Sequence, residues 1–449
     1  MSAAQFLLDV FRSKSAETAI LWRGKSHSYG AILDCVEHWK HVLVREEIKG
    51  GRVVILEAEF SPNSVALWMA LLDASCIIVP LTKSVRDKKA EFIEVARGDV
   101  LLTLDDEDRI SVEKLGQQSD HALYDTLRAA GHPGLVLFSS GSTGKSKAAV
   151  HDFVPILDKF RTPRKVYRTI AFLLFDHIGG VNTLLYTLSN GGTLIVCEER
   201  SPDHVLGAIE KFRGELLPTS PTFINLILLS EAYQRHDLSS LKLVTYGTEV
   251  MPETTLRRFH DLFPNIQLSQ TYGLSEVGIL RAKSRSSDSL WVKIGGEGFQ
   301  TRVVDGTLQI KASSAMLGYL NAPSPFTDDG WFMTGDSVEV DGDYMKILGR
   351  KSELINVGGE KVYPSEVESV IQEFENVAEV AVFGEKNPLV GNIVCARVRL
   401  KQTDGSDDFI VRLKSFCRER MQPYKIPVKI SLTTQSQYSE RYKKMRPAQ

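Results

Sequence analysis

Residues Leu135–Lys147 read LVLFSSGSTGKSK, so an apolar run leads directly into a loop of glycine, serine, threonine and lysine. A short apolar run bounded by loop residues predicts a buried β-strand. In the loop, glycine lets backbone N–H groups approach an anion, hydroxyl groups add donors, and lysine adds positive charge. We therefore interpret the loop as a phosphate-binding site, although its composition is also that of a flexible polar surface loop.

The loop differs from the P-loop of kinases and NTPases. Residues Gly144, Lys145 and Ser146 match the end of the motif GxxxxGK[ST]. That motif also requires a glycine five residues before Gly144, and this chain has Ser139 there. A Walker-type nucleotide site is therefore excluded.

Strand-like and helix-like stretches alternate on both sides of this loop. Strand-like runs lie at residues 52–56, 76–80, 134–138 and 192–196, and helix-like stretches at residues 63–72 and 181–188. This order predicts α/β units with a largely parallel sheet. After residue 286 the pattern changes to short strands joined by Asp-Gly turns at residues 305–306 and 341–342.

The length of the chain predicts more than one domain. It has 449 residues, whereas single hydrophobic cores stop growing at ~250–300 residues. A separate strand and helix pattern follows Gly349. We therefore predict an α/β protein with a large N-terminal domain, residues 1–349, of α/β layers with mixed, largely parallel sheets. A small, mobile α+β domain, residues 350–449, is expected to follow a hinge at Arg350–Lys351.

Charge and cysteine content narrow the range of functions. Lys and Arg total 54 and Asp and Glu total 56. The chain therefore lacks the excess of positive charge that is typical of nucleic-acid-binding proteins. The five cysteines are scattered without a CxxC pair, which favours a reducing cytoplasm.

Asp9 and Arg12 interrupt the first apolar stretch, so no signal peptide is expected. The longest apolar run, Val65–Leu81, contains Asp73 and Pro80 and predicts a buried helix and strand, not a membrane span.

The segment FSSGSTGKSKAAV, residues 138–150, resembles the signature loop of the adenylate-forming superfamily. This superfamily includes acyl-CoA synthetases, nonribosomal peptide synthetase adenylation domains and firefly luciferase, and its loop usually reads [TS]SG[TS]TGxPKG. Ser146 replaces the usual proline and Ala148 the last glycine, and neither change removes a phosphate-binding group. The resemblance implies that ATP or AMP contacts Ser139, Ser140, Gly141, Ser142, Thr143, Gly144 and Lys147.

Two further motifs follow in the order that the family has. YGTE at residues 246–249 resembles its adenine-binding turn, and QTYGLSE at residues 270–276 resembles its YGxTE element. The resemblance implies that Tyr272 stacks on adenine, that Ser275 contacts the α-phosphate, and that Glu276 and Thr143 hold Mg²⁺. Taken alone, Tyr272 also fits a core aromatic and Glu276 a surface acid. The nucleotide-binding residues implied here are Gly247, Thr248, Glu249, Gln270, Thr271, Tyr272, Gly273 and Ser275.

The C-terminal third carries the remaining motifs. WFMTGD at residues 331–336 places Asp336 where the family's aspartate binds both ribose hydroxyls, and Gly349-Arg350-Lys351 resembles the hinge, with Arg350 at the nucleotide. NVGGEKVYPSEVE at residues 356–368 resembles the hairpin and helix that approach the thiol, which implicates Gly358 and Gly359. Lys443 keeps the spacing of the family's GKxxR motif, but Tyr442 replaces its glycine and Lys444 is adjacent. Which of the two lysines acts in adenylation therefore stays open.

The resemblance implies an AMP-forming acid–thiol ligase that uses ATP and Mg²⁺. A small carboxylic acid attacks the α-phosphorus of ATP, pyrophosphate leaves, and the acyl group of the acyl-AMP passes to a thiol. CoA is the expected acceptor, and the alternative is a stand-alone enzyme that loads an acyl or aminoacyl group onto the phosphopantetheine of a carrier protein. The competing hypothesis from a different functional class is a catalytically inactive binding module. Expected catalytic residues are Lys443, Glu276, Lys147 and His177, and expected acyl-site residues are Phe175, His177 and Gly273.

The pattern next to His177 leaves the acid itself open. Asp176 would suit the ammonium group of an amino-acid substrate, whereas the sequence His-Ile-Gly-Gly that starts at His177 is more similar to acyl- or aryl-CoA ligases. The acid, the acceptor thiol and the oligomeric state are therefore not assigned from the sequence.

Overall fold

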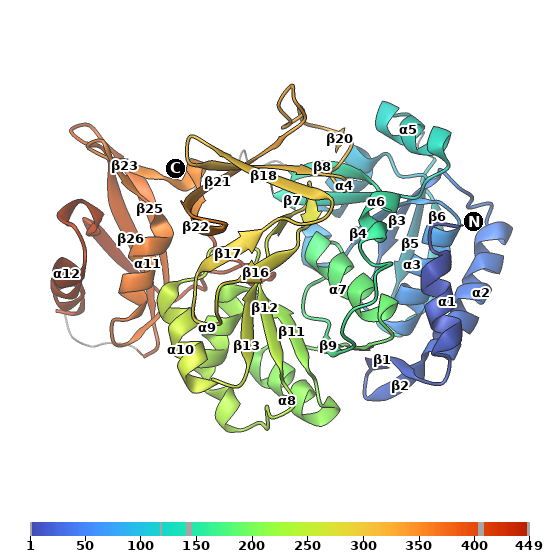
Figure 1. The fold of residues 1–449 in the computed structure, drawn as a ribbon, viewed down its shortest axis with the longest axis horizontal. Helices are drawn as coiled ribbons and strands as arrows, with labels where there is room; N and C mark the ends of the chain where they lie inside the picture. The colour runs from blue at the N-terminus through green and yellow to red at the C-terminus, as the bar shows by residue number, and fades with distance from the viewer. Residues whose placement is uncertain (1, 117–118, 141–145, 403–407, 447–449) are drawn as a thin grey trace.

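The computed structural model describes residues 2–116, 119–140, 146–402 and 408–446. A large body, built from the N-terminal and central residues, lies beside a smaller one formed by the C-terminal residues (Figure 1). Within these ranges the strands form two seven-stranded sheets, a six-stranded sheet, a five-stranded sheet and a two-stranded sheet. This mixed α/β architecture confirms the predicted fold class.

The apolar strand that opens the phosphate loop lies inside the first seven-stranded sheet, whose order is β20-β8-β7-β4-β3-β5-β6. Its central strands are parallel and almost entirely buried, as their continuous apolar sequence requires. The strands are β3 (Val53–Glu57), β4 (Ile77–Leu81), β5 (Val100–Leu104), β6 (Ile110–Lys114), β7 (Gly134–Ser140), β8 (Ser146–Asp152) and β20 (Gly318–Tyr319).

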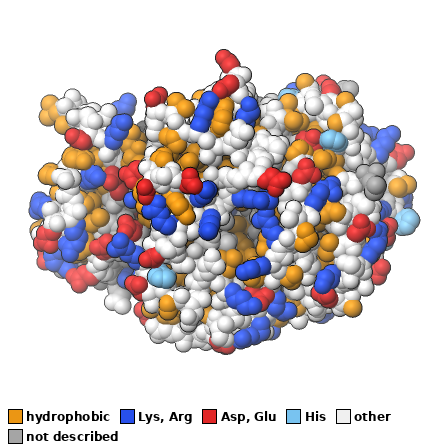
Figure 2. Space-filling model, in the orientation of Figure 1, with side chains coloured by type: hydrophobic (Ala, Val, Ile, Leu, Met, Phe, Trp, Pro, Cys, Tyr) orange, Lys and Arg blue, Asp and Glu red, His pale blue; other side chains and the backbone are white. Residues whose placement is uncertain are grey.

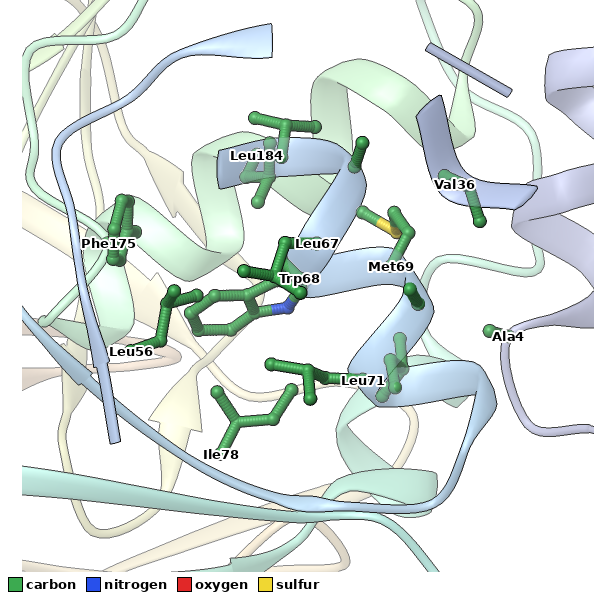
Figure 3. Close-up of a cluster of buried hydrophobic side chains, with 14 of the residues drawn as sticks. Ala4, Val36, Leu56, Leu67, Trp68, Met69, Leu71, Ile78, Phe175 and Leu184 are labelled. Carbon is green, nitrogen blue, oxygen red and sulfur yellow. The ribbon is translucent and has the colours of Figure 1, made fainter. Parts of the chain in front are cut away.

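Helix α3 (Pro62–Asp73) connects β3 to β4 and is buried on nearly all sides. It begins at a capping box in which the Ser61 and Ser64 hydroxyls each accept the other residue's backbone N–H at 2.9 Å. Figure 3 shows Trp68 of this helix directed toward Leu56 of β3 and toward Phe175. The rings of Trp68 and Phe175 are 5.5 Å apart between centroids. This core therefore anchors the segment that leads to His177.

The second seven-stranded sheet has the order β13-β12-β11-β9-β10-β1-β2. All its pairings are parallel except the one between β1 and β2, so the carboxyl ends of β12 and β13 lie at the same edge. The strands are β1 (Thr18–Trp22), β2 (Lys25–Ser28), β9 (Arg168–Ile170), β10 (Thr193–Ile195), β11 (Leu216–Thr219), β12 (Leu243–Tyr246) and β13 (Gln267–Gln270).

Eleven further α-helices accompany the sheets in the described ranges, and α11 is given below with the smaller body. The others are α1 (Gln5–Ser13), α2 (Tyr29–Arg45), α4 (Lys89–Ala96), α5 (Ala122–Ala130), α6 (Phe153–Asp158), α7 (Ile178–Ser189), α8 (Pro202–Phe212), α9 (Pro221–Ser230), α10 (Glu253–Leu262) and α12 (Phe409–Arg420). None of the described helices combines the length and apolar character needed to cross a bilayer.

The six-stranded sheet is antiparallel, with the order β16-β17-β22-β21-β19-β18. Asp305 and Gly306 both have positive φ, at 49° and 70°, in the expected Asp-Gly turn between β18 and β19. The strands are β16 (Ala282–Ser284), β17 (Trp291–Ile294), β18 (Phe299–Val304), β19 (Thr307–Ala312), β21 (Phe332–Asp341) and β22 (Tyr344–Arg350), and the separate two-stranded sheet contains β14 (Gly273–Leu274) and β15 (Gly278–Ile279).

The smaller body has its own sheet and its own apolar core. Strand β22 ends at Arg350 in the six-stranded sheet, a short 3₁₀ turn (Lys351–Glu353) follows, and the next strand already belongs to the five-stranded sheet. The elements are β23 (Ile355–Val357), β24 (Glu360–Val362), α11 (Pro364–Gln372), β25 (Val377–Asn387), β26 (Gly391–Leu400) and β27 (Lys429–Thr433). The hinge at Arg350–Lys351 stays a prediction.

Candidate active site

The ends of β12 and β13 bring two of the predicted nucleotide motifs together. The Thr271 N–H donates to the Tyr246 carbonyl at 2.8 Å, and the Thr271 hydroxyl donates to the same oxygen at 3.1 Å. A Cβ added at Gly247 would lie 2.6 Å from Thr271 Oγ1 and 2.9 Å from its carbonyl oxygen. Glycine is therefore required at 247 for the two segments to approach this closely. Thr248 follows with a left-handed φ of 74°.

Tyr272, Asp336 and Arg350 form a connected polar group beside these strand ends. The Tyr272 hydroxyl donates to Asp336 Oδ2 at 2.5 Å, and Arg350 Nε lies 2.9 Å from Asp336 Oδ1. Asp336 and Arg350 are register partners of β21 and β22, so the sheet itself pairs them. Burial raises the pKa of Asp336, and the charge of Arg350 opposes this shift. Both carboxylate oxygens are thus fixed in place.

Glu276, in the YGxTE-like segment, contacts the hairpin of β7 and β8 that carries the predicted phosphate loop. Its Oε1 accepts from the Tyr319 hydroxyl at 2.8 Å and from Ser139 Oγ at 3.4 Å. Lys147, the register partner of Ser139, has its Nζ 5.4 Å from the centre of the Tyr319 ring. Ser140 ends β7, while the predicted phosphate-binding residues Gly141, Ser142, Thr143 and Gly144 lie outside the described residues.

Buried His151 supports the turn at Ser275. Its Nε2 is 2.6 Å from the Ser275 carbonyl oxygen and donates to it in the neutral ring. Burial lowers the pKa of His151, which maintains that neutral form. Gln270, also buried, has a side-chain oxygen without a hydrogen-bond partner in the described structure. This oxygen is also sealed from solvent, so its capacity to accept a hydrogen bond is unused in this arrangement.

The C-terminal tail, residues 441–446, brings Lys443 to the start of α7. Lys443 Nζ lies 3.0 Å from Nε2 of His177, the residue that precedes the helix. The charge of Lys443 and, next, burial hold the pKa of His177 well below its ordinary value. Burial and the nearby Arg441 lower the pKa of Lys443 to about 8. The neutral imidazole therefore accepts a hydrogen bond from the ammonium group.

Tyr442 explains the departure from the family's GKxxR motif. Its φ of 53° is in the left-handed region that favours glycine. Its ring packs against Phe172 and Phe223, with centroid distances of 5.3 and 5.1 Å. Its hydroxyl donates to the Arg200 carbonyl at 2.6 Å, and its own carbonyl accepts from Ser220 Oγ at 2.7 Å. These contacts offset the unfavourable backbone conformation and seat the tail on the large body.

Lys444 points to a different partner from Lys443. Its Nζ forms an ion pair with Glu368 of α11 at 3.0 Å, and Arg446 pairs with Glu368 at 2.8 Å. The Lys444 N–H also donates to Glu249 Oε2 at 2.9 Å, so the predicted nucleotide residue Glu249 contacts the tail. Lys444 thus fastens the tail, while Lys443 alone of the two reaches His177.

The segment before α7 serves packing and tail attachment. Phe175, predicted to line the acyl site, is only 2% exposed and lies in the core with Trp68. Asp176 is also buried; its Oδ2 accepts from Thr82 Oγ1 at 2.8 Å and pairs with Arg441 at 2.6 Å. Burial raises the pKa of Asp176, and Arg441 opposes this shift. In this arrangement the Asp176 carboxylate holds the tail through Arg441.

The predicted thiol-side residues lie apart from this cluster. Gly358 and Gly359, with φ of 60° and 97°, form the turn between β23 and β24. An added Cβ at either position would meet no atom within 4 Å. Strand β23 lies in the upper part of the small body in the view of Figure 1. The arrangement therefore brings the predicted adenylation residue Lys443 to His177, and the turn predicted to face the thiol lies outside this contact.

Tyr319, His151 and Arg441 were not among the residues predicted from the sequence. Each reaches the site from a distant part of the chain: Arg441 meets Asp176 across 265 positions, and His151 meets Ser275 across 124. Tyr319 lies on the short strand β20, which pairs with β8. Only the tertiary fold reveals all three residues.

Comparison with known proteins agrees with this geometry. Residues 9–308 match the family model "AMP-binding enzyme", and residues 366–439 match "AMP-binding enzyme C-terminal domain". Indoleacetate–CoA ligase of Aromatoleum aromaticum is 30% identical over 318 residues, which cover 64% of this chain and 62% of that protein. A putative acyl–CoA ligase, YdaB, of Bacillus subtilis is 26% identical over 436 residues, 84% of each chain.

A solved structure shares the whole fold. The anthranilate CoA ligase AuaEII, in complex with anthranoyl-AMP, superposes with a TM-score of 0.82 at 20% identity, covering 97% of this chain and 94% of that one. The alignment with indoleacetate–CoA ligase thus spans less than two thirds of that protein, whereas the structural match spans nearly all of both chains. The predicted superfamily is confirmed by these matches, and the chain belongs to the AMP-binding enzyme family.

Proposed function

We propose that this protein is an AMP-forming acid–thiol ligase that activates a carboxylic acid with ATP and transfers the acyl group to CoA. The observation that carries the proposal is the position of Lys443, which the tail brings to His177 on the large body. The acid's oxygen bonds to the α-phosphorus, the bond to pyrophosphate breaks, and acyl-AMP forms. A thiolate then bonds to the acyl carbon, and AMP leaves. Acyl- and aryl-CoA ligases among the relatives support this reaction.

Lys443 acts as a mobile positive charge in the first step. Its ammonium group donates to His177 in the absence of substrate, and an incoming carboxylate or phosphate oxygen is a stronger acceptor than imidazole because it is charged. Bound anions also raise the pKa of a neighbouring lysine. We therefore infer that the ammonium turns from His177 to the reacting oxygens, where charge develops in the transition state.

The residues near Glu276 fit a magnesium ion bound together with ATP. Mg²⁺ is usually held by one or two carboxylates plus substrate phosphates. Glu276 Oε1 is oriented by Tyr319 and Ser139, and its Oε2 has no hydrogen-bond partner among the described residues. Glu276 would therefore hold the ion, with Thr143 as the second predicted ligand, and the ion would supply positive charge to the phosphates. No group of three or more His, Cys, Asp or Glu in the described ranges forms a protein-only metal site.

The remaining predicted residues are assigned to the nucleotide. Asp336, whose oxygens are fixed by Tyr272 and Arg350, is proposed to accept hydrogen bonds from both ribose hydroxyls. The side-chain oxygen of Gln270 has a free acceptor position in the same region. The close turn at residues 247–249 and the segment at residues 271–275 are proposed to enclose the adenine, and Lys147 with the loop before it to contact the phosphates.

We further propose that the two steps use two arrangements of domains 1–349 and 350–449, joined at Arg350–Lys351. The tail residue Lys443 meets the large body, whereas the Gly358–Gly359 turn is in open space. The arrangement described here therefore suits adenylation. Rotation of the small domain would withdraw Lys443 and present the turn to the thiol.

A reducing, cytoplasmic location is proposed on the basis of the cysteines. All five are free, and Cys76, Cys395 and Cys417 are buried. Burial raises the pKa of Cys76 and Cys197 to about 12, so these thiols are poor nucleophiles and no cysteine is assigned to the chemistry.

An acid screen tests the proposed reaction. The purified protein is incubated with ATP, Mg²⁺ and a panel of aryl, fatty, hydroxy and dicarboxylic acids, and pyrophosphate release is measured. Acid-dependent pyrophosphate and an acyl-AMP mass are expected, followed by an acyl-CoA mass when CoA is added. Release of ADP and phosphate would contradict the proposal. Transfer to a phosphopantetheinylated carrier protein with no transfer to CoA would replace the proposed acceptor.

A further inference from the structure

A lysine contacts the base of the hairpin that carries the predicted phosphate loop. Lys88 ends the 3₁₀ segment Lys83–Lys88, which leads into α4. Its Nζ donates to Ser146 Oγ at 3.3 Å. Ser146 is the first residue of β8 and is only 4% exposed, whereas Lys88 is exposed. The lysine thus reaches from the surface to a hydroxyl group inside the protein.

Lys88 differs from the neighbouring lysines in its partner. Lys83 forms an ion pair with Asp106, and Lys89 forms one with Glu57 at 2.6 Å. No carboxylate in the described part of the chain forms an ion pair with Lys88. Its ammonium group is therefore held by a hydroxyl of β8 and by no described acid.

The side chains of the hairpin alternate between two faces. Ser139 and Lys147 are register partners, and the Ser139 hydroxyl is directed at Glu276. Ser146 belongs to the next pair of the hairpin, so its side chain is on the opposite face. Lys88 therefore approaches the hairpin from the side away from Glu276.

Helix α4 covers this opposite face. Phe92 of α4 stacks on Phe138 of β7, with ring centroids 3.9 Å apart and an angle of 2° between the ring planes. Both rings are buried. Phe138 lies eight residues before Ser146 in the chain and on the same face of the hairpin. The stacked rings fix the segment that carries Lys88 against the hairpin, so its contact with Ser146 has a rigid frame.

The backbone on both sides of Lys147 is held by Asn321. Its Nδ2 donates to the Ser146 carbonyl at 2.9 Å, and its Oδ1 accepts from the Ala148 N–H at 3.0 Å. The hydrogen bond from Lys88 adds the side chain of Ser146 to these contacts. Together they fix the path of the chain immediately before and after Lys147.

The residue at position 146 makes such a contact useful. Ser146 stands where the usual loop pattern has a proline. The proline ring would fix its own φ and would also restrict the residue before it. Serine imposes neither restraint, so the conformation of the chain here depends on other groups. The hydrogen bond from Lys88 is a restraint of this kind.

A general attraction between Lys88 and anions is a weaker explanation. Figure 2 shows Lys and Arg side chains around a hollow in the middle of the face where α7 and β16 lie. An anion that approaches this face is attracted by many charges together. Removal of one exposed charge changes such a field little, because solvent and salt screen it. An effect of Lys88 on a bound anion would therefore come from its contact with Ser146.

We propose that Lys88 is a positioning residue for ATP, which holds the start of β8 through Ser146 and so keeps Lys147 directed at the phosphates. This inference rests on the proposed function, in which Lys147 contacts the phosphates. Lys88 itself touches no reacting atom. Loss of its side chain should therefore weaken the binding of ATP and leave the binding of the acid unchanged.

The test is a double-mutant cycle. Wild type, Lys88→Met, Ser146→Ala and the double variant are compared by calorimetric binding of ATP with Mg²⁺ in the absence of acid. Each single variant should weaken ATP binding by ~2–10-fold, the range that one hydrogen bond corresponds to. The double variant should bind no more weakly than either single variant, because both remove the same contact. Arg86→Met removes another exposed charge of the same segment and should bind ATP as wild type does.

Ser146→Pro supplies a rescue that a merely structural role of Lys88 would not show. The variant Lys88→Met/Ser146→Pro should bind ATP as tightly as Ser146→Pro alone, because the ring replaces the restraint. In steady-state assays Lys88→Met should raise KM for ATP and leave KM for the acid and the Tm near their wild-type values. If Ser146→Pro does not fold, the cycle with Ser146→Ala decides.

Three results would overturn the inference. The first is an equal loss of ATP binding from Lys88→Met in the wild-type and Ser146→Ala backgrounds, since Lys88 would then act without Ser146. The second is an equal loss in Arg86→Met, which would indicate an effect of net charge. The third is unchanged ATP binding in Lys88→Met.

The two proposals can fail separately. ATP binding that depends on Lys88 and Ser146, together with no pyrophosphate from any acid, would contradict only the proposed function. Acid-dependent pyrophosphate together with ATP binding that is unchanged in Lys88→Met would overturn only the positioning role. Absence of ATP binding by the wild-type protein would overturn both.

Discussion

Nη2 of Arg441, in the C-terminal tail, lies 2.6 Å from Oδ2 of Asp176, the residue immediately before His177. The pair is largely enclosed, and Arg441 also donates to Ser84 Oγ at 3.2 Å. Because Asp176 adjoins His177 and Arg441 is two residues before Lys443, the ion pair holds in place both residues that meet at the proposed reaction centre. The tail is therefore positioned by a contact that takes no part in the chemistry.

Replacement of Arg441 by methionine should impair adenylation more than thioester formation. The variant leaves the Asp176 carboxylate buried without its cation, and breaking a buried pair typically costs ~3–5 kcal/mol. Pyrophosphate release should fall at least ~10-fold, whereas CoA transfer from synthetic acyl-AMP should be maintained. The double variant Asp176→Asn/Arg441→Met should lose less than the sum of the single effects. Strict additivity would show that the pair does not act as a unit.

Lys443→Ala should reduce adenylation by ~10²–10³-fold, as does the loss of one preorganised donor in other enzymes. Thioester formation from synthetic acyl-AMP should stay largely intact, since the proposed scheme withdraws the tail in that step. Lys444→Ala is the matched control, because Glu368 keeps its ion pair with Arg446. Adenylation that is lost in Lys444→Ala and kept in Lys443→Ala would mean that the lysines have been assigned in the wrong order.

Adenylation should fall as the pH rises through about 8. The pKa of Lys443 in the substrate-free protein is lowered to about 8, so the ammonium is present below that pH and is lost above it. The profile of kcat/KM for the acid, which reports the free enzyme, should therefore have a descending limb near pH 8. In Lys443→Ala this limb should be missing. If Lys443→Ala keeps the descending limb near pH 8, the group that titrates there is not Lys443.

Asp336→Asn should weaken the use of ATP. Loss of a charged hydrogen bond costs ~1.5–3 kcal/mol, so one lost ribose contact corresponds to ~10–150-fold in kcat/KM for ATP. Asp341→Asn is the control, since Asp341 ends the same strand and forms a pair with Arg285 at an exposed site. A ribose-binding role is contradicted by an unchanged KM for ATP together with unchanged turnover in Asp336→Asn.

Gly359→Leu should impair thioester formation and spare adenylation. Gly359 is in open space in this arrangement, so its side chain would interfere only after the turn moves toward the thiol. Its φ of 97° adds local strain, and Gly342→Leu controls for this because Gly342, at φ 59°, also has open space and lies in another turn. Equal loss of both steps in Gly359→Leu would indicate that the two-arrangement scheme does not apply.

Local sequence patterns were sufficient to predict most of the elements around the site. The strand expected at 134–138 is β7, the helix expected at 63–72 is α3, and the helix expected at 181–188 lies within α7. These segments carry their own signals, such as continuous apolar runs and the proline at the start of α3.

Contacts between distant segments could not be predicted in the same way. Nothing near Asp176 in the chain indicates that its partner is Arg441, and nothing near Phe175 indicates that it faces Trp68 and not a pocket. Tyr442 is a further case: local propensity disfavours a tyrosine with positive φ, and only its packing against Phe172 and Phe223 explains it. Tertiary packing decides such positions.

The attachment of Lys444 and Arg446 to Glu368 has a consequence for the lifetime of the intermediate. Burial opposes ionisation of Glu368, but Lys444 and Arg446 outweigh this effect and lower its pKa to about 2, so the attachment persists across ordinary pH. Because Glu368 belongs to α11, the tail is expected to move with the small domain in the two-arrangement scheme that we propose. Withdrawal of Lys443 and arrival of the thiol-side turn would then be a single event. Such coupling would shorten the interval in which acyl-AMP has neither Lys443 nor the thiol beside it.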